Sequence, residues 1–327
     1  MGRSIRSGLA LVCALVVQVA ATQAKADCDL RRWAELPVAL RALQPLVSAK
    51  IDGHEAQLLL DTGAWASTLS PKSVGRYGLK LGAAPPNLRV FGVGGSLEVN
   101  VATVKVFTLG ATPIEDVDFL VGGGEPRGGY AGLLGQNILH IADEEFDFQA
   151  GVIRLFKPKG CERANLAYWA GDKAVSVLEL EPQNPHSPFV IATGRVNGVR
   201  MRVMFDTGAT TSVMTLEAAA RAGIRTDGPG VVAAGYAGGL DGRALQTWIA
   251  PVDSFELGGE QVKRTKMRIG GGGVAGVEAP DMLLGADFFR SHHVLISNSQ
   301  HRVYFTYAGG PVFDLSTGAQ APTAPAP

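Results

Sequence analysis

The chain alternates between short apolar runs and turn-forming residues, a pattern typical of strands joined by tight turns. Asp52-Gly53 and Asn197-Gly198 each lie between two apolar runs. Both dipeptides are preferred two-residue hairpin turns, because both positions of such a turn need positive φ. The pattern therefore predicts two hairpins, with strands at 46–51, 56–60, 189–196 and 201–205.

Each predicted hairpin is followed by the same order of further elements. A short helix comes next, opened by a hydroxyl cap at Ser70 or Thr215 and closed by a glycine at Gly78 or Gly223. A second short helix and a closing strand complete each half, at 136–140, 152–156, 286–291 and 302–307. The matching order indicates one folding unit that has been duplicated.

The residues that end the two hairpins are the most unusual in this pattern. Asp61 and Asp206 each follow three apolar residues, although a strand that enters a core rarely ends on a charge. Both have the same Thr-Gly-Ala tail, and both are followed later by Leu-Leu-Gly. A duplicated fold would bring the two carboxyl groups into contact. They would then share a proton and act together as acid and base.

The paired motifs resemble the aspartic proteases of the pepsin and retropepsin clan, and the alanine after each glycine is closer to the retroviral type. The resemblance covers most of residues 36–307. It implies a mostly β, bilobal acid-protease fold, built from two homologous β-barrel-like lobes with a few short helices. It also implies that Asp61 and Asp206 are the catalytic pair of an aspartic endopeptidase that acts on extended polypeptides without cofactor or metal.

The resemblance also gives roles to the neighbours of the two aspartates. The threonines would hydrogen-bond across a pseudo-two-fold axis, and the glycines would let the backbone pass close to the carboxylates. The loop-supporting set is Thr62, Gly63, Ala64, Thr207, Gly208 and Ala209. The segments expected to pack under these loops are Leu133, Leu134, Gly135, Leu283, Leu284 and Gly285. Retroviral enzymes often carry Arg next, but here Gln136 and Ala286 follow, so that brace must come from elsewhere or be absent.

Members of this family close a glycine-tipped hairpin, the flap, over the substrate. Each half contains one candidate segment, the first being Phe91, Gly92, Val93, Gly94 and Gly95. The second comprises Gly235, Tyr236, Ala237, Gly238 and Gly239. Glycine-rich tips suit a lid that must flex. The alternative interpretation is two ordinary surface turns.

The N-terminal segment has the features of a cleavable export signal. Arg3 and Arg6 precede an apolar run, and Ala24-Lys25-Ala26 is a small-x-small cleavage signature. We expect cleavage after Ala26 and a periplasmic or secreted protein without a stable membrane anchor. The expected organisation is a signal peptide at 1–26, an N-terminal arm at 27–35, an N-terminal protease lobe at 36–158, a linker at 159–172, a C-terminal protease lobe at 173–307 and a Pro/Ala-rich tail at 308–327, disordered at its end.

Two cysteines remain after cleavage, Cys28 and Cys161. An even pair in an exported protein predicts a disulfide, which would tie together the two ends of the first half. Two free buried thiols are the alternative. The helix-prone stretch at 30–35 forms either a packed N-terminal arm or, within 27–44, a prosegment over the groove.

The charge balance of the mature chain gives no electrostatic reason to expect nucleic acid or anionic lipid as a partner. Removal of Arg3, Arg6 and Lys25 leaves 27 basic residues (30 minus 3) against 30 acidic residues. The expected partner is a polypeptide substrate, and the expected state is a monomer with pseudo-two-fold symmetry. His292-His293 lacks an accompanying acid or cysteine cluster, so we expect a solvated surface there and not a metal site.

Two other functions use the same residues. A pseudo-protease would keep the fold and bind peptides in the groove between the lobes without cutting them. A glycoside hydrolase would use the two acids at a separation of about 5–9 Å. The matched loops predict closer contact than that.

Overall fold

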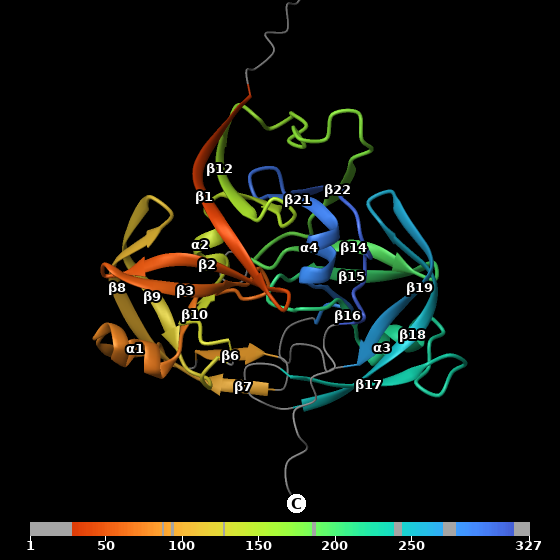
Figure 1. Cartoon of the computed structure of the whole chain (residues 1–327), viewed down its shortest axis with the longest axis horizontal. Coiled ribbons are helices and arrows are strands. Elements are labelled where there is room, and N and C mark those ends of the chain that lie inside the picture. The colour runs from red at the N-terminus through yellow and green to blue at the C-terminus, as the bar shows by residue number, and fades with distance from the viewer. Residues whose placement is uncertain are drawn as a thin grey trace, which may run out of the picture.

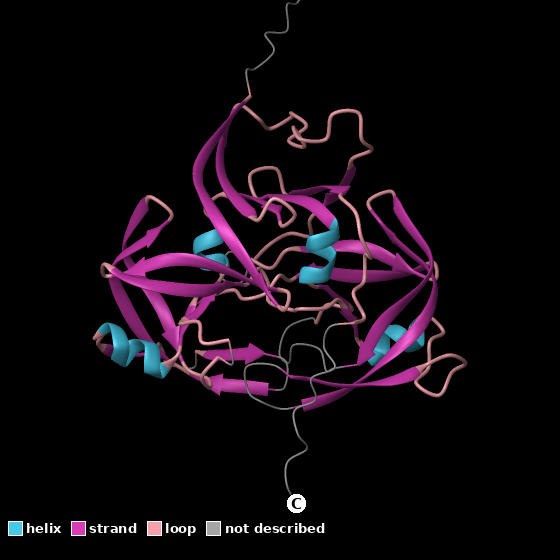
Figure 2. Cartoon of the chain, in the orientation of Figure 1, coloured by secondary structure: helices cyan, strands magenta, loops and turns pink. Residues whose placement is uncertain are grey.

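The computed structural model describes residues 28–316 except 87, 93–94, 127, 185–187, 239–243 and 271–278. The predicted signal peptide at 1–26 and the predicted disordered end of the tail therefore lie outside the described residues. Figure 1 shows two lobes side by side, joined at the top of the view by strands from both halves. Strands dominate both lobes and the helices are short (Figure 2), so the fold is the mostly β, bilobal architecture of acid proteases.

The first lobe contains one predicted hairpin and the strands that fold around it. Its turn residues Asp52 and Gly53 both have positive φ, 47° and 84°, as the hairpin requires. The elements are β2 (Gln44–Ile51), β3 (His54–Leu60), β4 (Thr68–Leu69), α1 (Pro71–Tyr77), β5 (Leu81–Ala83), β6 (Arg89–Gly92), β7 (Gly95–Glu98), β8 (Asn100–Leu109), β9 (Thr112–Val121), β10 (Gly132–Leu134) and α2 (Gln136–Leu139).

The second lobe repeats this order around the second predicted hairpin. Its turn residues Asn197 and Gly198 have φ of 48° and 77°. The elements are β14 (Ile191–Val196), β15 (Val199–Phe205), β16 (Val213–Met214), α3 (Leu216–Arg221), β17 (Val232–Gly238), β18 (Ala244–Leu257), β19 (Glu260–Gly270), β20 (Met282–Leu284) and α4 (Ala286–Ser291).

The predicted helices form within one or two residues of their expected ends, and for the expected reasons. The side chain of Ser70 accepts a hydrogen bond from the N–H of Ser73, and Gly78 closes α1 in the left-handed conformation. The side chain of Thr215 likewise accepts from the N–H of Ala218 at the start of α3. These local signals fix where the chain turns away from each acid-bearing strand.

A sheet of six strands, three from each half, joins the two lobes. Its order is β13 (Ser176–Glu179), β22 (Arg302–Tyr307), β21 (His292–Ser297), β11 (Asp143–Asp147), β12 (Val152–Lys159) and β1 (Asp29–Arg41). At its centre β11 and β21 pair antiparallel, with Glu145 opposite Leu295. We call this layer the inter-lobe sheet. Only the strands at 152–156 and 302–307 were expected from the sequence.

The helix-prone interpretation of the N-terminal arm is wrong. Residues 29–37 form the first part of β1 and pair antiparallel with β12, and the last residues of β1 pair with β2. Tertiary pairing overrides a weak helical preference here, because the open edge of β12 offers a complete ladder of hydrogen bonds. The N-terminal segment is thus an integral strand of the inter-lobe sheet.

The two histidines predicted to be solvated instead lie within β21, with His292 buried and His293 half-buried. The ring of His292 is enclosed, with Nε2 3.1 Å from Oε1 of Glu260. His293 stacks on Trp169 and places Nε2 2.8 Å from Oε1 of Glu145. Neighbouring residues on a strand point to opposite faces, and here both faces are covered. The surface prediction failed because it considered the sequence around the histidines and not what packs on β21.

Three consecutive acidic residues of β11 are buried in the inter-lobe sheet. Glu145 accepts bonds from Arg154, Tyr168 and His293, and although its burial raises the pKa, these partners lower it overall. Glu144 accepts a bond from Nδ2 of Asn298 at 3.0 Å, and this bond and one from Gln136 only partly offset the effects of burial and of the neighbouring charge of Asp143. Burial therefore raises the pKa of Glu144 to about 8.

Where the structure describes them, the segment predicted as linker packs against this sheet and the segment predicted as tail packs against β18 and α4 of the second lobe. Cys161, Leu166 and Ala167 form an apolar cluster with Leu295 and Tyr304 of the inter-lobe sheet. In the tail, the ring of Phe313 packs edge-on against Phe255, and Asp314 binds Arg290. No helix among the described residues has the length and apolarity needed to cross a bilayer.

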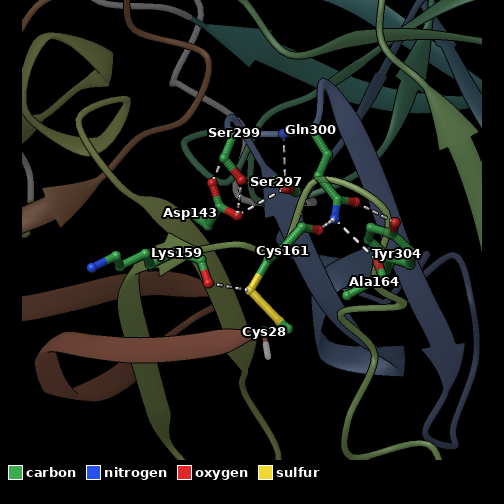
Figure 3. Close-up of a disulfide and its surroundings, with 9 residues drawn as sticks. All are labelled: Cys28, Asp143, Lys159, Cys161, Ala164, Ser297, Ser299, Gln300 and Tyr304. Carbon is green, nitrogen blue, oxygen red and sulfur yellow. Dashed lines mark hydrogen bonds between the residues drawn. A yellow bond between two sulfur atoms is a disulfide. The ribbon is translucent and has the colours of Figure 1, made fainter. Parts of the chain in front are cut away.

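Cys28 and Cys161 are joined in a disulfide, as predicted (Figure 3). The bond links the residue before β1 to the residues just after β12, the two outermost strands on this side of the inter-lobe sheet. Gln300, from the turn between β21 and β22, donates to the carbonyl oxygens of Cys161 and Ala164. The disulfide therefore fixes a corner at which both halves of the chain meet.

We predict that a Cys28→Ser/Cys161→Ser variant loses about 4–5 kcal/mol of unfolding free energy, because a loop of this size restricts the unfolded chain strongly. The sequence separation of the two cysteines is 133. Urea unfolding followed by fluorescence measures the loss. Wild type under reducing conditions is the control and should match the variant. Equal midpoints for oxidised wild type and the variant would contradict the prediction.

Candidate active site

The loops after β3 and β15 bring Asp61 and Asp206 together. A Cβ built at Gly63 would lie 2.4 Å from Cγ of Asp206, and one at Gly208 would lie 2.4 Å from Cγ of Asp61. Each carboxyl group thus lies against the backbone of the opposite loop. Any larger residue at either position would collide with the facing carboxyl group, so these two glycines are required by close approach.

Two threonines lock the loops together with four reciprocal hydrogen bonds. The N–H of Thr62 donates to Oγ1 of Thr207 at 3.1 Å, and the N–H of Thr207 donates to Oγ1 of Thr62 at 3.0 Å. Each hydroxyl then donates across the interface at 2.8 Å, to the carbonyl oxygen of Phe205 or Leu60. Both side chains are fully buried, so every polar atom of this lock has its partner away from water.

The pKa of each aspartate is raised, first by burial. The negative charge of Asp206 and a hydrogen bond between the two carboxyl groups raise the pKa of Asp61 further, well above its ordinary value. Oδ1 of Asp61 accepts from the N–H of Gly63 at 3.0 Å, and Oδ1 of Asp206 accepts from the N–H groups of Gly208 and Ala209 at 2.9 and 3.1 Å, so loop N–H groups favour the ionised form of either acid. The pair therefore shares one proton.

The Leu-Leu-Gly segments pack under the acid loops. β10 runs parallel to β3 and β20 runs parallel to β15, so that Leu134 lies beside Leu60 and Leu284 beside Phe205. The N–H of Asp61 donates to the carbonyl oxygen of Leu134 at 3.0 Å. The N–H of Asp206 donates to that of Leu284 at 2.9 Å. Both catalytic-loop candidates are thereby attached to the core of their own lobe.

A second brace, which the sequence analysis missed, repeats in the two halves. Oδ1 of Asn137 accepts from the N–H and the hydroxyl of Ser67, and Oδ1 of Asp287 accepts from the same groups of Ser212. Each serine hydroxyl also accepts from the glycine of its Leu-Leu-Gly segment at 3.0 Å. A serine at the same spacing after each Asp-Thr-Gly-Ala motif was the available signal.

The arginine brace of retroviral enzymes is replaced by groups of lower charge. The buried Gln136 directs Nε2 toward the carbonyl oxygen of Thr62 at 3.4 Å. Ala286 contributes only its N–H, which donates to the carbonyl oxygen of Ala209. In the second half the anchoring acid is Asp287, whose pKa burial raises to about 6 despite the bonds that it accepts.

The flap candidates occupy paired strands on the side of the molecule opposite the inter-lobe sheet (Figure 1). Phe91, Gly92 and Gly95 belong to the β6–β7 hairpin, and Gly92 pairs with Gly95. Gly235, Tyr236, Ala237 and Gly238 lie in β17, which pairs with β18. Val93, Gly94 and Gly239 lie outside the described residues. Closure over a substrate stays a prediction.

Within residues 28–316, apart from the gaps given above, no three His, Cys, Asp or Glu side chains gather as a metal-binding group.

We predict that Thr62→Val and Thr207→Val each lower the unfolding free energy by on the order of 3 kcal/mol, because each leaves a buried N–H and a buried carbonyl unpaired. Chemical denaturation measures the change. Thr103→Val is the matched control, since its hydroxyl bonds Asp118 on an exposed face and its loss should cost less than about 1 kcal/mol. Equal small effects at all three sites would show that the lock contributes little.

Comparison with known proteins assigns the two halves separately. Residues 47–140 match a family described as "gag-polyprotein putative aspartyl protease", and residues 192–288 match one described as "Aspartyl protease". A search of curated proteins finds no significant match. Among solved structures, an aspartic proteinase from Irpex lacteus is 14% identical, with a TM-score of 0.46, over 84% of this chain and 97% of that one. Since each match contains one acid loop and the Leu-Leu-Gly segment beneath it, the chain belongs to the aspartic protease family.

Proposed function

We propose that this protein is an aspartic endopeptidase that hydrolyses peptide bonds of extended polypeptides. The observation that carries the proposal is the contact between Asp61 and Asp206, each pressed against the glycine of the opposite loop. Contact at this range leaves one proton on the pair, which is the state needed for combined acid and base catalysis.

The two carboxyl groups take different roles in the proposed mechanism. The ionised partner, whose negative charge is favoured by loop N–H groups, accepts a proton from a bound water as the water oxygen attacks the peptide carbonyl carbon. The protonated partner donates its proton to the developing oxyanion. The proton taken from the water then passes to the amide nitrogen, the C–N bond breaks, and the carboxyl group that gave up its proton recovers one from the tetrahedral intermediate.

The geometry supports peptide hydrolysis over glycoside hydrolysis. Glycosidases of either type keep their two carboxyl groups about 5–9 Å apart. Asp61 and Asp206 each lie against the glycine of the opposite acid loop, which leaves no room for such a gap between them. A pseudo-protease would share the fold, and the variants described below separate it from an active enzyme.

The disulfide supports a site of action outside the cytoplasm. Bonds such as Cys28–Cys161 form and persist mainly in oxidising compartments. We therefore propose that the protein is exported, to the periplasm or beyond, and acts there as a monomer whose matching halves derive from duplication.

We predict that Asp61→Asn and Asp206→Asn each reduce peptide cleavage by roughly 10³-fold or more while leaving the fold intact. A diverse peptide library analysed by mass spectrometry measures cleavage. Binding of a statine-type inhibitor measures whether the groove between the lobes still accepts a ligand. Asp52→Asn is the control, because it gives the first hairpin the Asn-Gly turn of the second and should leave activity unchanged. Peptide binding by wild type without any product would favour the pseudo-protease.

We predict a bell-shaped dependence of kcat/KM on pH. On the acid side the rate falls as the ionised partner of the pair takes up a proton, and on the alkaline side it falls as the pair loses its shared proton. Because the pKa of Asp61 is raised well above its ordinary value, the alkaline limb should lie above the usual titration range of aspartate. A fluorogenic peptide found in the library measures the profile. A rate that climbs steadily through neutral pH would contradict a shared proton.

A further inference from the structure

The strand β17 contains a bulge next to the second flap candidate. β17 pairs with β18 at Val232–Ile249 and Ala233–Trp248, and the pairing resumes at Tyr236–Gln246. Two residues of β17, Ala234 and Gly235, therefore face a single residue of β18. Gly235 has φ of 74°, which glycine adopts without strain. Such a bulge bends a strand and sets its direction beyond that point.

Two buried side chains hold the carbonyl groups of this bulge. Oγ1 of Thr247 lies 3.2 Å from the carbonyl oxygen of Ala234 and 3.3 Å from that of Gly235. Nη1 of Arg268 donates to the carbonyl oxygen of Ala234 at 2.9 Å and to Oγ1 of Thr247 at 2.7 Å. Because Arg268 donates to Oγ1 of Thr247, the hydroxyl proton of Thr247 is available to bond the carbonyl oxygens of the bulge.

Placing an arginine here carries a cost that packing alone does not explain. Arg268 is only 4% exposed, and its burial lowers its pKa, opposed by the negative charge of Asp287. A buried cation is unfavourable unless its hydrogen bonds serve a defined geometry. The bulge in β17 is the geometry that these bonds serve.

The first half shows that the fold itself does not need this polar pair. Arg268 lies opposite Ile249 and beside Val213, and in the same register Leu120 lies opposite Val101 and beside Thr68. The position that matches Thr247 by spacing is Val99, where β7 and β8 separate. The chain therefore carries Val and Leu in one half where it carries Thr and Arg in the other.

We propose that Thr247 and Arg268 are positioning residues for the second flap, fixing the β17 bulge so that this hairpin is already set for an extended substrate. The proposal rests on the proposed function, since it concerns how the groove receives a peptide. A strand that is already held in place loses less conformational entropy when a substrate binds. The two flaps would then differ, because only the second has this polar support among the described residues.

The Thr247→Val/Arg268→Leu variant tests the proposal by copying the Val99 and Leu120 pair into the second half. Amide hydrogen exchange in residues 232–238 of the unliganded protein should become at least about tenfold faster, while β14 and β15 keep their protection. KM should rise about tenfold with kcat and the pH profile little changed, because the acid pair is untouched. Leu120→Met is the matched control in the first half and should alter neither reading.

A conservative series separates hydrogen bonding from packing at Arg268. Arg268→Met keeps the unbranched stem without donors and should behave like the double variant, whereas Arg268→Lys keeps a donor and should restore part of the protection and part of KM. If the double variant does not fold, the same exchange and KM measurements are made on the single Thr247→Val variant. Unchanged exchange in β17 would overturn the proposal, and so would equal behaviour of the Met and Lys variants.

The failure of the proposed function would be recognised separately. If wild type cleaves no peptide, the endopeptidase proposal fails, yet exchange in β17 and the affinity for a statine-type inhibitor still decide whether Thr247 and Arg268 position the strand. A collapse of kcat with a shifted pH profile would also overturn the inference, because it would place these residues in the acid machinery.

Discussion

The close approach of two acid loops is the constraint on which the rest of this structure depends. Carboxyl groups can meet at Asp61 and Asp206 only because neither Gly63 nor Gly208 has a side chain. The threonine lock holds the loops at that distance, and the Leu-Leu-Gly segments hold each loop to its own lobe. The inter-lobe sheet joins the lobes through the pairing of β11 with β21, so that the meeting point of the acids lies between two connected halves.

The parts that the sequence predicted are those encoded by neighbouring residues. Asp52-Gly53 determines a turn and Ser70 caps a helix, and neither depends on a distant partner. The inter-lobe sheet could not be found in this way. β11 reads Asp-Glu-Glu-Phe-Asp, which is typical of an exposed segment, and only groups such as Asn298 and His293, from far along the chain, make its burial tolerable. The acid pair was predictable because its motif occurs twice, while the serine brace around it was overlooked.

Comparing the two halves separates the contacts that surround the acid pair from the contacts that occur in one lobe only. The threonine lock and the Ser67–Asn137 and Ser212–Asp287 braces are repeated, because both loops must present their acids in the same way. The Thr247–Arg268 pair has no polar counterpart at Val99 and Leu120. Repeated contacts therefore surround the two acids, and the unrepeated Thr247–Arg268 contacts lie at the bulge of β17.

The buried Glu144 of β11 gives the junction of the lobes a dependence on acidity. Its pKa of about 8 lies above the ordinary value of 4.5, so the folded protein retains a proton that the unfolded chain releases. The resulting stabilisation is complete below about pH 4.5 and is lost progressively as the pH rises to about 8. At higher pH the side chain of Glu144 is charged in the middle of the inter-lobe sheet. The junction between the lobes is therefore more stable in acidic than in alkaline surroundings.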